Sequence, residues 1–164
     1  MTRAFIALGS NLQEPLGQLQ QAAFTIGALD NSEIKACSGV YRSAAVGPGD
    51  QPDYLNAVLE LETALAPLAL LDALQAIENQ QGRERSVRWG ARTLDLDIIL
   101  YGEQSLDTPR LTIPHPRMTQ RNFVLYPLAD ICPPNLMLPG GVELGTLVAA
   151  CPRGEMSKTT LDLL

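Results

Sequence analysis

TLDLDIILYG, residues 93–102, alternates its side chains with the period of two that is typical of a β-strand. One predicted face is wholly apolar and carries Leu94, Leu96, Ile98 and Leu100. The other face carries Asp95, Asp97, Ile99 and Tyr101. Two like charges so close together repel each other, and aspartate is a poor strand former. We therefore expect the apolar face to fix this strand and the aspartate pair to serve a chemical purpose.

Upstream of this strand, strand and helix patterns alternate along the chain. The patterns predict strands at 3–11, 32–43 and 54–65, a loop at 44–53, a helix from Pro15 to about Leu29, and a second helix over 67–81 that Gly82 ends as a C-cap. With the aspartate strand, the order is β-α-β-β-α-β, which is that of the ferredoxin-like α+β fold.

The residues after the aspartate strand add a smaller set of elements. A short helix is expected within 117–131, and the tail from Pro133 is expected to end in a strand or a short helix. No repeat or low-complexity linker divides the chain. We therefore predict one domain over 1–164, an α+β ferredoxin-like β-α-β-β-α-β sandwich with additional C-terminal elements.

The composition is that of a globular domain. Hydrophobic residues make up 46% of the 164 residues, which is enough for a sizeable core. No apolar run reaches the roughly 18 residues of a membrane-spanning helix, and the N-terminus lacks the pattern of a signal peptide. The three cysteines have no metal-binding spacing, so reduced thiols in a cytoplasmic protein are expected. The net charge of −6 argues against a general nucleic-acid or membrane binder.

Arginines are concentrated around the aspartate strand. Seven of the twelve basic residues are Arg83, Arg85, Arg88, Arg92, Arg110, Arg117 and Arg121. Composition alone leaves a solvated arginine-rich surface as an alternative. However, arginine suits bidentate binding of phosphate, and a local cationic patch on an acidic chain favours a compact polyanionic ligand.

An aspartate pair has several chemical uses. The two carboxyl groups can share a proton, act as acid and base in glycoside hydrolysis, or hold a divalent metal. Neighbouring arginines favour the third use, because Mg²⁺ and guanidinium groups together neutralise a polyphosphate. The chain lacks a Walker A loop, since neither Lys35 nor Lys158 follows a glycine. An ion-paired surface strand stays open as the structural alternative.

RWGARTLDLDII, residues 88–99, resembles the signature of the 6-hydroxymethyl-7,8-dihydropterin pyrophosphokinase family of folate biosynthesis. Further motifs are similar to the family's and follow in its order: FIALGSN (5–11), GDQPDYLNAV (49–58), ENQQGRER (78–85), RLTIPHPRM (110–118) and RNFVLYPL (121–128). The resemblance extends to about residue 130. It implies transfer of the β,γ-diphosphoryl unit of ATP, as co-substrate, to the hydroxymethyl group of the dihydropterin, with release of AMP. It also implies a monomer, and the net charge argues against nucleic-acid or membrane partners.

Site residues are implied by the same motifs. Asp95 and Asp97 would bind two Mg²⁺ ions, and Arg83 and Arg92 would join them as catalytic residues. The implied ATP-binding residues are Gln75, Glu78, Arg85, Arg88, Trp89, Ile98, Arg110, Thr112, His115 and Arg121. From the sequence alone, Gln75 and Glu78 also fit a solvated helix face, Arg110 and Arg121 fit ordinary surface arginines, and His115 fits a packing or capping residue.

The implied pterin-binding residues are Ser43, Ala44, Val46, Tyr54, Asn56, Trp89 and Phe123. A flat heterocycle edged with donors and acceptors needs stacking planes and amide partners, which aromatic and asparagine side chains supply. Core packing is the alternative for Phe123. The chain departs from the family where many members have two prolines and it has Ala44-Ala45, and the segment 83–92 is one residue shorter than in some relatives.

Two other functions remain open at this stage. One is a two-metal phosphohydrolase or nucleotidyltransferase that uses the same aspartate pair. The other is a non-enzymatic ferredoxin-like binding module for RNA or protein, although the chain lacks the aromatic strand motif of RNA-binding domains.

Overall fold

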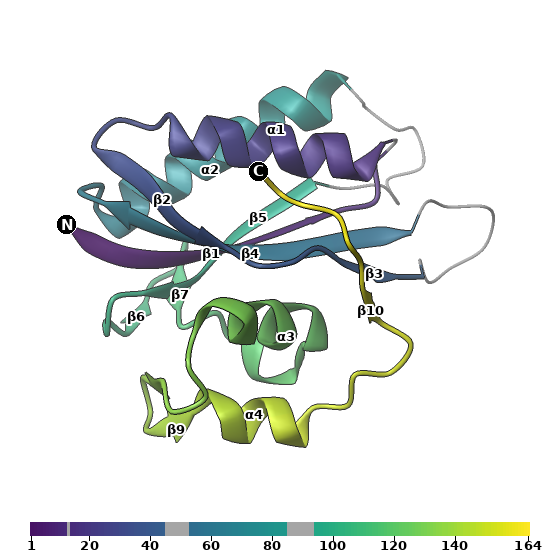
Figure 1. Ribbon diagram of the computed structural model, residues 1–164. Helices are drawn as coiled ribbons and strands as arrows, with labels where there is room; N and C mark the ends of the chain where they lie inside the picture. Colours follow the sequence, from purple (N-terminus) through teal and green to yellow (C-terminus); the bar gives the residue numbers. More distant parts are fainter. Residues whose placement is uncertain (13, 45–52, 85–93) are drawn as a thin grey trace.

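The computed structural model describes residues 1–12, 14–44, 53–84 and 94–164 (Figure 1). Its main elements are β1 (Thr2–Ser10), α1 (Pro15–Gly27), β2 (Ser32–Cys37), β3 (Tyr41–Ser43), β4 (Tyr54–Thr63), α2 (Pro67–Glu84) and β5 (Leu94–Tyr101). The smaller elements that follow are β6 (Leu106–Asp107), β7 (Thr112–Ile113), η1 (Met118–Gln120), α3 (Asn122–Ile131), β8 (Met137–Leu138), β9 (Val142–Glu143), α4 (Leu144–Ala150) and β10 (Ser157–Lys158).

The central sheet confirms the predicted ferredoxin-like order. β1 lies between β4 and β5, and both β2 and β3 pair with β4 on its other side. Every pair in this sheet is antiparallel. The last strand of the β-α-β-β-α-β unit therefore returns to lie beside the first strand, as the fold requires. β10 adds a C-terminal strand at the free edge of β3.

The sheet is covered on both faces, so it has two apolar cores. α1 and α2 cover one face, while α3 and α4 lie on the other (Figure 1). The predicted inward faces of the two long helices are confirmed, since the core under them includes Leu19, Ala23, Ile26, Leu70, Leu71, Leu74 and Ile77. The second core joins the opposite face of the sheet to Val124, Leu125 and Leu128 of α3.

The predicted faces of the aspartate strand are wrong from Leu100 onward. Ile6 pairs with Ile98 and Phe5 pairs with Leu100, so Ile99 is an extra residue in β5. Such a bulge shifts the alternation of side chains by one position. Leu100 consequently packs into the core beside α3, whereas Tyr101 turns back toward the helices and its hydroxyl donates to Leu65 O at 2.7 Å.

The single strand predicted at 32–43 is two strands. Ser38 separates them, because its hydroxyl oxygen accepts the Val58 N–H at 2.8 Å and its own N–H donates to Val58 O at 2.8 Å. A side-chain hydroxyl thus replaces a backbone partner in the ladder. The next strand, β3, starts at Tyr41.

The predicted C-cap at Gly82 is also wrong, because α2 continues to Glu84. A glycine inside a helix costs about 1 kcal/mol relative to alanine. Contacts with α1 offset this cost: the buried Gln81 amide donates to Gln18 O at 3.0 Å and to Gln18 Oε1 at 2.9 Å.

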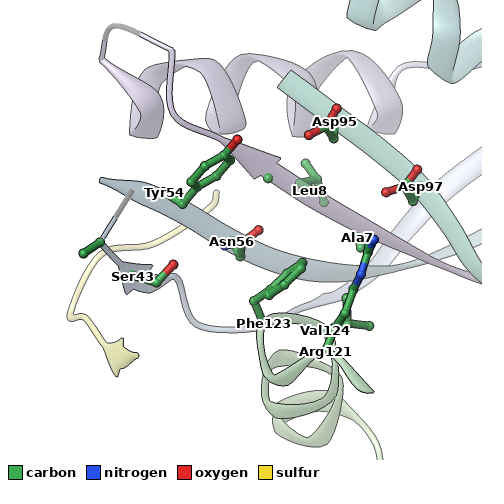
Figure 2. A pocket seen from close by; sticks show the side chains of 12 residues that line it. Ala7, Leu8, Ser43, Tyr54, Asn56, Asp95, Asp97, Arg121, Phe123 and Val124 are labelled. Atoms are coloured by element: carbon green, nitrogen blue, oxygen red, sulfur yellow. The ribbon is translucent and has the colours of Figure 1, made fainter. Parts of the chain in front are cut away.

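The C-terminal region confirms the expected short helix within 117–131, which is α3, and the tail contains both a helix and a strand. Asp95 and Asp97 lie on the face of the sheet that is directed toward the start of α3, and the candidate site lies between them (Figure 2). No helix in the described ranges is long and apolar enough to span a membrane.

Candidate active site

The two aspartates of β5 line a cavity, and one of them also lines a second cavity. β5 is the edge strand of the sheet, and its Asp95 and Asp97 pair with Gly9 and Ala7 of β1. Both carboxylates line a first cavity of about 390 Å³. Asp97 also lines a second cavity of about 290 Å³. A ligand group at Asp97 is therefore accessible from both sides.

The first cavity is formed between the sheet and the start of α3 (Figure 2). Its remaining lining residues are Ala7, Leu8, Gly9, Ser43, Ala44, Tyr54, Asn56, Arg121, Phe123 and Val124. Figure 2 shows Tyr54 and Asn56 on β4, Phe123 on α3 and the two aspartates on β5 around the same space. An aromatic ring and an amide on opposing walls suit a flat ligand with hydrogen-bonding edges.

Asn56 is held tightly against β1. Its side chain is only 7% exposed, and it pairs across the strands with Gly9. A Cβ atom at Gly9 would lie 2.5 Å from Asn56 Oδ1, which no ordinary contact allows. Sequence analysis did not single out Gly9, although a glycine inside a strand pattern is a signal of close approach by another group.

The second cavity lies on the other side of Asp97. The structure brings five of the implied ATP-binding residues together there: Gln75, Ile98, Arg110, Thr112 and His115. Arg110 Nη2 donates to Asp72 Oδ1 at 2.6 Å and to Gln75 Oε1 at 3.4 Å. The cavity also contains residues that the sequence did not single out, which are Leu71, Thr108, Pro109, Leu111 and Pro116.

His115 faces this cavity as a neutral imidazole. Burial lowers its pKa, with Arg121 and Arg117 acting in the same direction, while Asp97 opposes them. Its Nδ1 accepts the Arg117 N–H at 3.2 Å, which leaves the proton on Nε2. The ring can therefore donate one hydrogen bond to an anionic oxygen.

Glu78 and Arg121 are placed differently from the other implied ATP-binding residues. Glu78 lines neither cavity, and its Oε2 accepts the Leu96 N–H at 2.7 Å. The pKa of Glu78 is raised to about 7, mainly by burial and also by the charges of Asp95 and Asp97, while the hydrogen bond from Leu96 opposes the shift. Arg121 lines the first cavity, with its guanidinium 5.4 Å from the centre of the Phe123 ring.

Several predicted site residues lie outside the described residues. These are Val46, Arg85, Arg88, Trp89 and Arg92. Arg83 belongs to the last turn of α2, and its side chain is likewise outside the described part.

The aspartate pair fits Mg²⁺ by the chemistry of its donors. Among the described residues, no group of three or more His, Cys, Asp and Glu could hold a metal ion. Mg²⁺ does not require such a group, because it binds through one or two carboxylates and completes its shell with waters and substrate phosphates. Asp95 and Asp97 are therefore suited to an ion that is shared with a polyphosphate.

Solved structures share this fold. The chain superposes on a crystal structure of HPPK-DHPS in complex with substrates with a TM-score of 0.70 and 14% identity, over 92% of this chain and 45% of that one. It superposes equally on Plasmodium falciparum HPPK-DHPS wild type with pteroate, with a TM-score of 0.70 and 14% identity, over 91% of this chain and 42% of that one. The chain thus spans less than half of these proteins, and the likeness concerns the fold.

The sequence comparisons concern the family. The chain is 57% identical to the 2-amino-4-hydroxy-6-hydroxymethyldihydropteridine pyrophosphokinase of Pseudomonas aeruginosa over 150 residues, which is 92% of each chain. It is 52% identical to the enzyme of the same name from Haemophilus influenzae over 158 residues, 96% of this chain and 98% of that one. The family model of 7,8-dihydro-6-hydroxymethylpterin-pyrophosphokinase (HPPK) matches residues 5–133. The chain therefore belongs to the 7,8-dihydro-6-hydroxymethylpterin-pyrophosphokinase family, as its motifs predict.

Proposed function

We propose that this chain transfers the β,γ-diphosphoryl group of ATP to the hydroxyl of 6-hydroxymethyl-7,8-dihydropterin, as a step of tetrahydrofolate biosynthesis. The observation that carries the proposal is the position of Asp97, which lines both cavities. Two substrates bound in adjoining cavities would meet at this residue. The names of the relatives support the same pair of substrates.

The pterin occupies the first cavity in this proposal. Phe123 offers a stacking plane and Asn56 an amide that can pair with the donor and acceptor edge of the ring. Ser43, Ala44 and Tyr54 complete the wall on the strand side. The volume of about 390 Å³ lies within the range of roughly 300–1,000 Å³ of small-molecule sites.

ATP occupies the second cavity, with its triphosphate directed toward Asp97. Arg110, Gln75 and the Nε2–H of His115 supply donors to phosphate oxygens, while Ile98 and Thr112 lie on the adenosine side. Asp95 and Asp97 would hold Mg²⁺, two ions in this proposal. When bound, the metal neutralises charge on the triphosphate. Arg83 and Arg92 are proposed to stabilise the remaining charge as the transition state forms.

The reaction needs no covalent intermediate with the protein. The hydroxymethyl oxygen attacks the β-phosphorus, and the bond from that phosphorus to the α,β-bridging oxygen breaks. AMP leaves with the bridging oxygen, and the hydroxyl proton passes to solvent. The protein contributes by orienting both substrates and by stabilising charge.

Product analysis tests this proposal. The protein is incubated with ATP, Mg²⁺ and 6-hydroxymethyl-7,8-dihydropterin, and a parallel sample omits the pterin. We expect AMP and the pterin diphosphate in equal amounts, and AMP only when the pterin is present. ADP or inorganic phosphate would instead indicate a phosphohydrolase, and no turnover at all would favour a binding module. The monomeric state and the cytoplasmic location stay predictions.

A further inference from the structure

Asp130, in the last turn of α3, is the centre of a network that joins four parts of the chain. Its two carboxylate oxygens accept the Tyr41 hydroxyl at 2.9 and 3.1 Å. Its Oδ2 also accepts the Gly39 N–H at 3.1 Å and pairs with Lys158 Nζ at 3.3 Å. Lys158 Nζ lies 5.9 Å from the centre of the Tyr41 ring. We call these four residues the Asp130 junction.

The junction is enclosed on the side of the sheet and open at its lysine. Tyr41 is 4% exposed, the Asp130 side chain is 20% exposed, and the Lys158 side chain is 48% exposed. A Cβ atom at Gly39 would lie 2.5 Å from Lys158 Cε, so the glycine gives room for the lysine stem. Burial raises the pKa of the Tyr41 phenol, and Asp130 raises it further, so the hydroxyl remains a donor. Hydrogen bonds to an ionised carboxylate are roughly twice as strong as neutral ones.

The junction connects the two walls of the first cavity. Tyr41 is the direct partner of Asn56 across β3 and β4, and Ser43 is the partner of Tyr54. Partners in a strand pair direct their side chains to the same face of the sheet. At the other side of the gap, one helix carries both Phe123 in its first turn and Asp130 in its last.

We propose that Asp130 is a positioning residue for the pterin cavity, which fixes the helix wall at Phe123 relative to the strand wall at Asn56. Lys158 of β10 takes part, so the C-terminal strand contributes to the cavity although it lies beyond the residues 5–133 that the family model matches. Among the described residues, α3 otherwise contacts the sheet through the second apolar core, and apolar packing is less directional than a hydrogen bond. This inference rests on the proposed function of the first cavity.

The test measures the binding of each ligand separately. 6-Hydroxymethylpterin is titrated by its fluorescence with Mg²⁺ and the α,β-methylene analogue of ATP at saturation, and the analogue is titrated alone by calorimetry. For Asp130→Ala we expect roughly tenfold weaker pterin binding, as for loss of a charged hydrogen-bond partner, with analogue affinity unchanged within about twofold. Asp130→Asn retains one carbonyl acceptor for Tyr41 and should recover part of the loss.

Glu60→Ala is the matched control. Glu60 is a carboxylate on the same face of the sheet, 14% exposed and paired with Arg3 Nε at 3.0 Å, but it does not line the cavity. It should lower thermal stability without changing pterin affinity. Lys158→Met should weaken pterin binding by less than Asp130→Ala, by at most about fivefold; an unchanged affinity would overturn the role assigned to β10.

The outcomes separate this inference from the proposed function. If the unmodified protein does not bind the pterin, or if Asn56→Ala has no effect, the proposed function fails. If Asn56→Ala weakens pterin binding but Asp130→Asn and Asp130→Ala do not, only the positioning role fails. Equal losses of pterin and analogue affinity in both Asp130 variants would also overturn it, since they would indicate general destabilisation.

Discussion

At the residue scale, the site depends on the absence of a side chain at Gly9. Gly9 has no Cβ, and the space left by that atom is filled by the side-chain oxygen of Asn56. The position of the Asn56 side chain, which is proposed to bind the pterin, therefore depends on its strand partner Gly9 as much as on its own rotamer.

Gly9→Ala should weaken pterin binding because the new methyl group displaces the Asn56 amide. We expect a loss close to that of Asn56→Ala, which leaves ligand groups unpaired and costs about 1–3 kcal/mol, or roughly ten- to hundredfold. The two changes act on one contact, so the double variant should be no worse than Asn56→Ala alone. Titration of all three variants with 6-hydroxymethylpterin completes this double-mutant cycle. Simple additivity of the two losses in affinity would contradict the expectation.

Asp95→Asn and Asp97→Asn should each lower turnover by on the order of 10²–10³, as for loss of one charge-stabilising group. Neither aspartate belongs to the two apolar cores, and asparagine preserves the shape of the side chain. For Asp97→Asn the melting temperature should stay the same or rise, because one of two neighbouring like charges is removed. AMP formation and thermal melts test both parts. Near-normal turnover of either variant would remove the metal assignment.

At the scale of elements, α2 braces the edge strand that carries the aspartates. Leu96 N–H lies between Asp95 and Asp97 in the sequence, and Glu78 accepts it at 2.7 Å. An edge strand leaves such donors without a strand partner, so the helix supplies one.

The pH dependence of the stability of Glu78→Gln tests this contact between Glu78 and Leu96. Because the pKa of Glu78 in the folded protein is raised from 4.5 to about 7, its contribution to stability is complete below pH 4.5 and is lost as pH rises through 7. The amide keeps an acceptor for Leu96 but does not ionise. The variant should therefore gain stability relative to the unmodified protein between pH 5 and pH 8. Thermal melts at both pH values with a chelator present check this; an equal difference at the two values would contradict it.

At the scale of elements, the parts of the fold that can be predicted from the sequence are those that local patterns determine. Binary patterns were sufficient for the two helices and for β1 and β4, since those patterns are local and continuous. The bulge at Ile99, the break at Ser38 and the extension of α2 past Gly82 each depend on a partner distant in sequence: Phe5, Val58 and Gln18. Motif resemblance likewise indicated Asp97 and Asn56. Gly9 carries only the general signal of a glycine inside a strand pattern, and Asp130 is informative only once its neighbours are known.

At the scale of the whole molecule, the two cavities should be separable by mutation. Arg110 lines only the second cavity, and its ion pair with Asp72 is exposed on both sides. Such pairs contribute about 0–1 kcal/mol to stability, so removing this one should leave the fold unaffected.

Arg110→Ala should weaken binding of the ATP analogue roughly tenfold through loss of a phosphate partner, and leave pterin affinity unchanged. Asp72→Ala is the matched control, because it breaks the same ion pair but keeps the guanidinium. Calorimetric titration of both variants distinguishes the two roles. A loss of analogue affinity in Asp72→Ala as large as that in Arg110→Ala would indicate that the ion pair, and not a nucleotide contact, is responsible.

The central claim is that the β,γ-diphosphoryl unit passes between the two cavities as one group. Tracing phosphorus atoms tests this most directly, with ATP labelled with ³²P in either the α or the γ position and supplied with Mg²⁺ and 6-hydroxymethyl-7,8-dihydropterin. We predict that all α label released from ATP appears in AMP and that all γ label released appears in the pterin product. Recovery of α label in ADP, or of γ label in inorganic phosphate, would contradict the account.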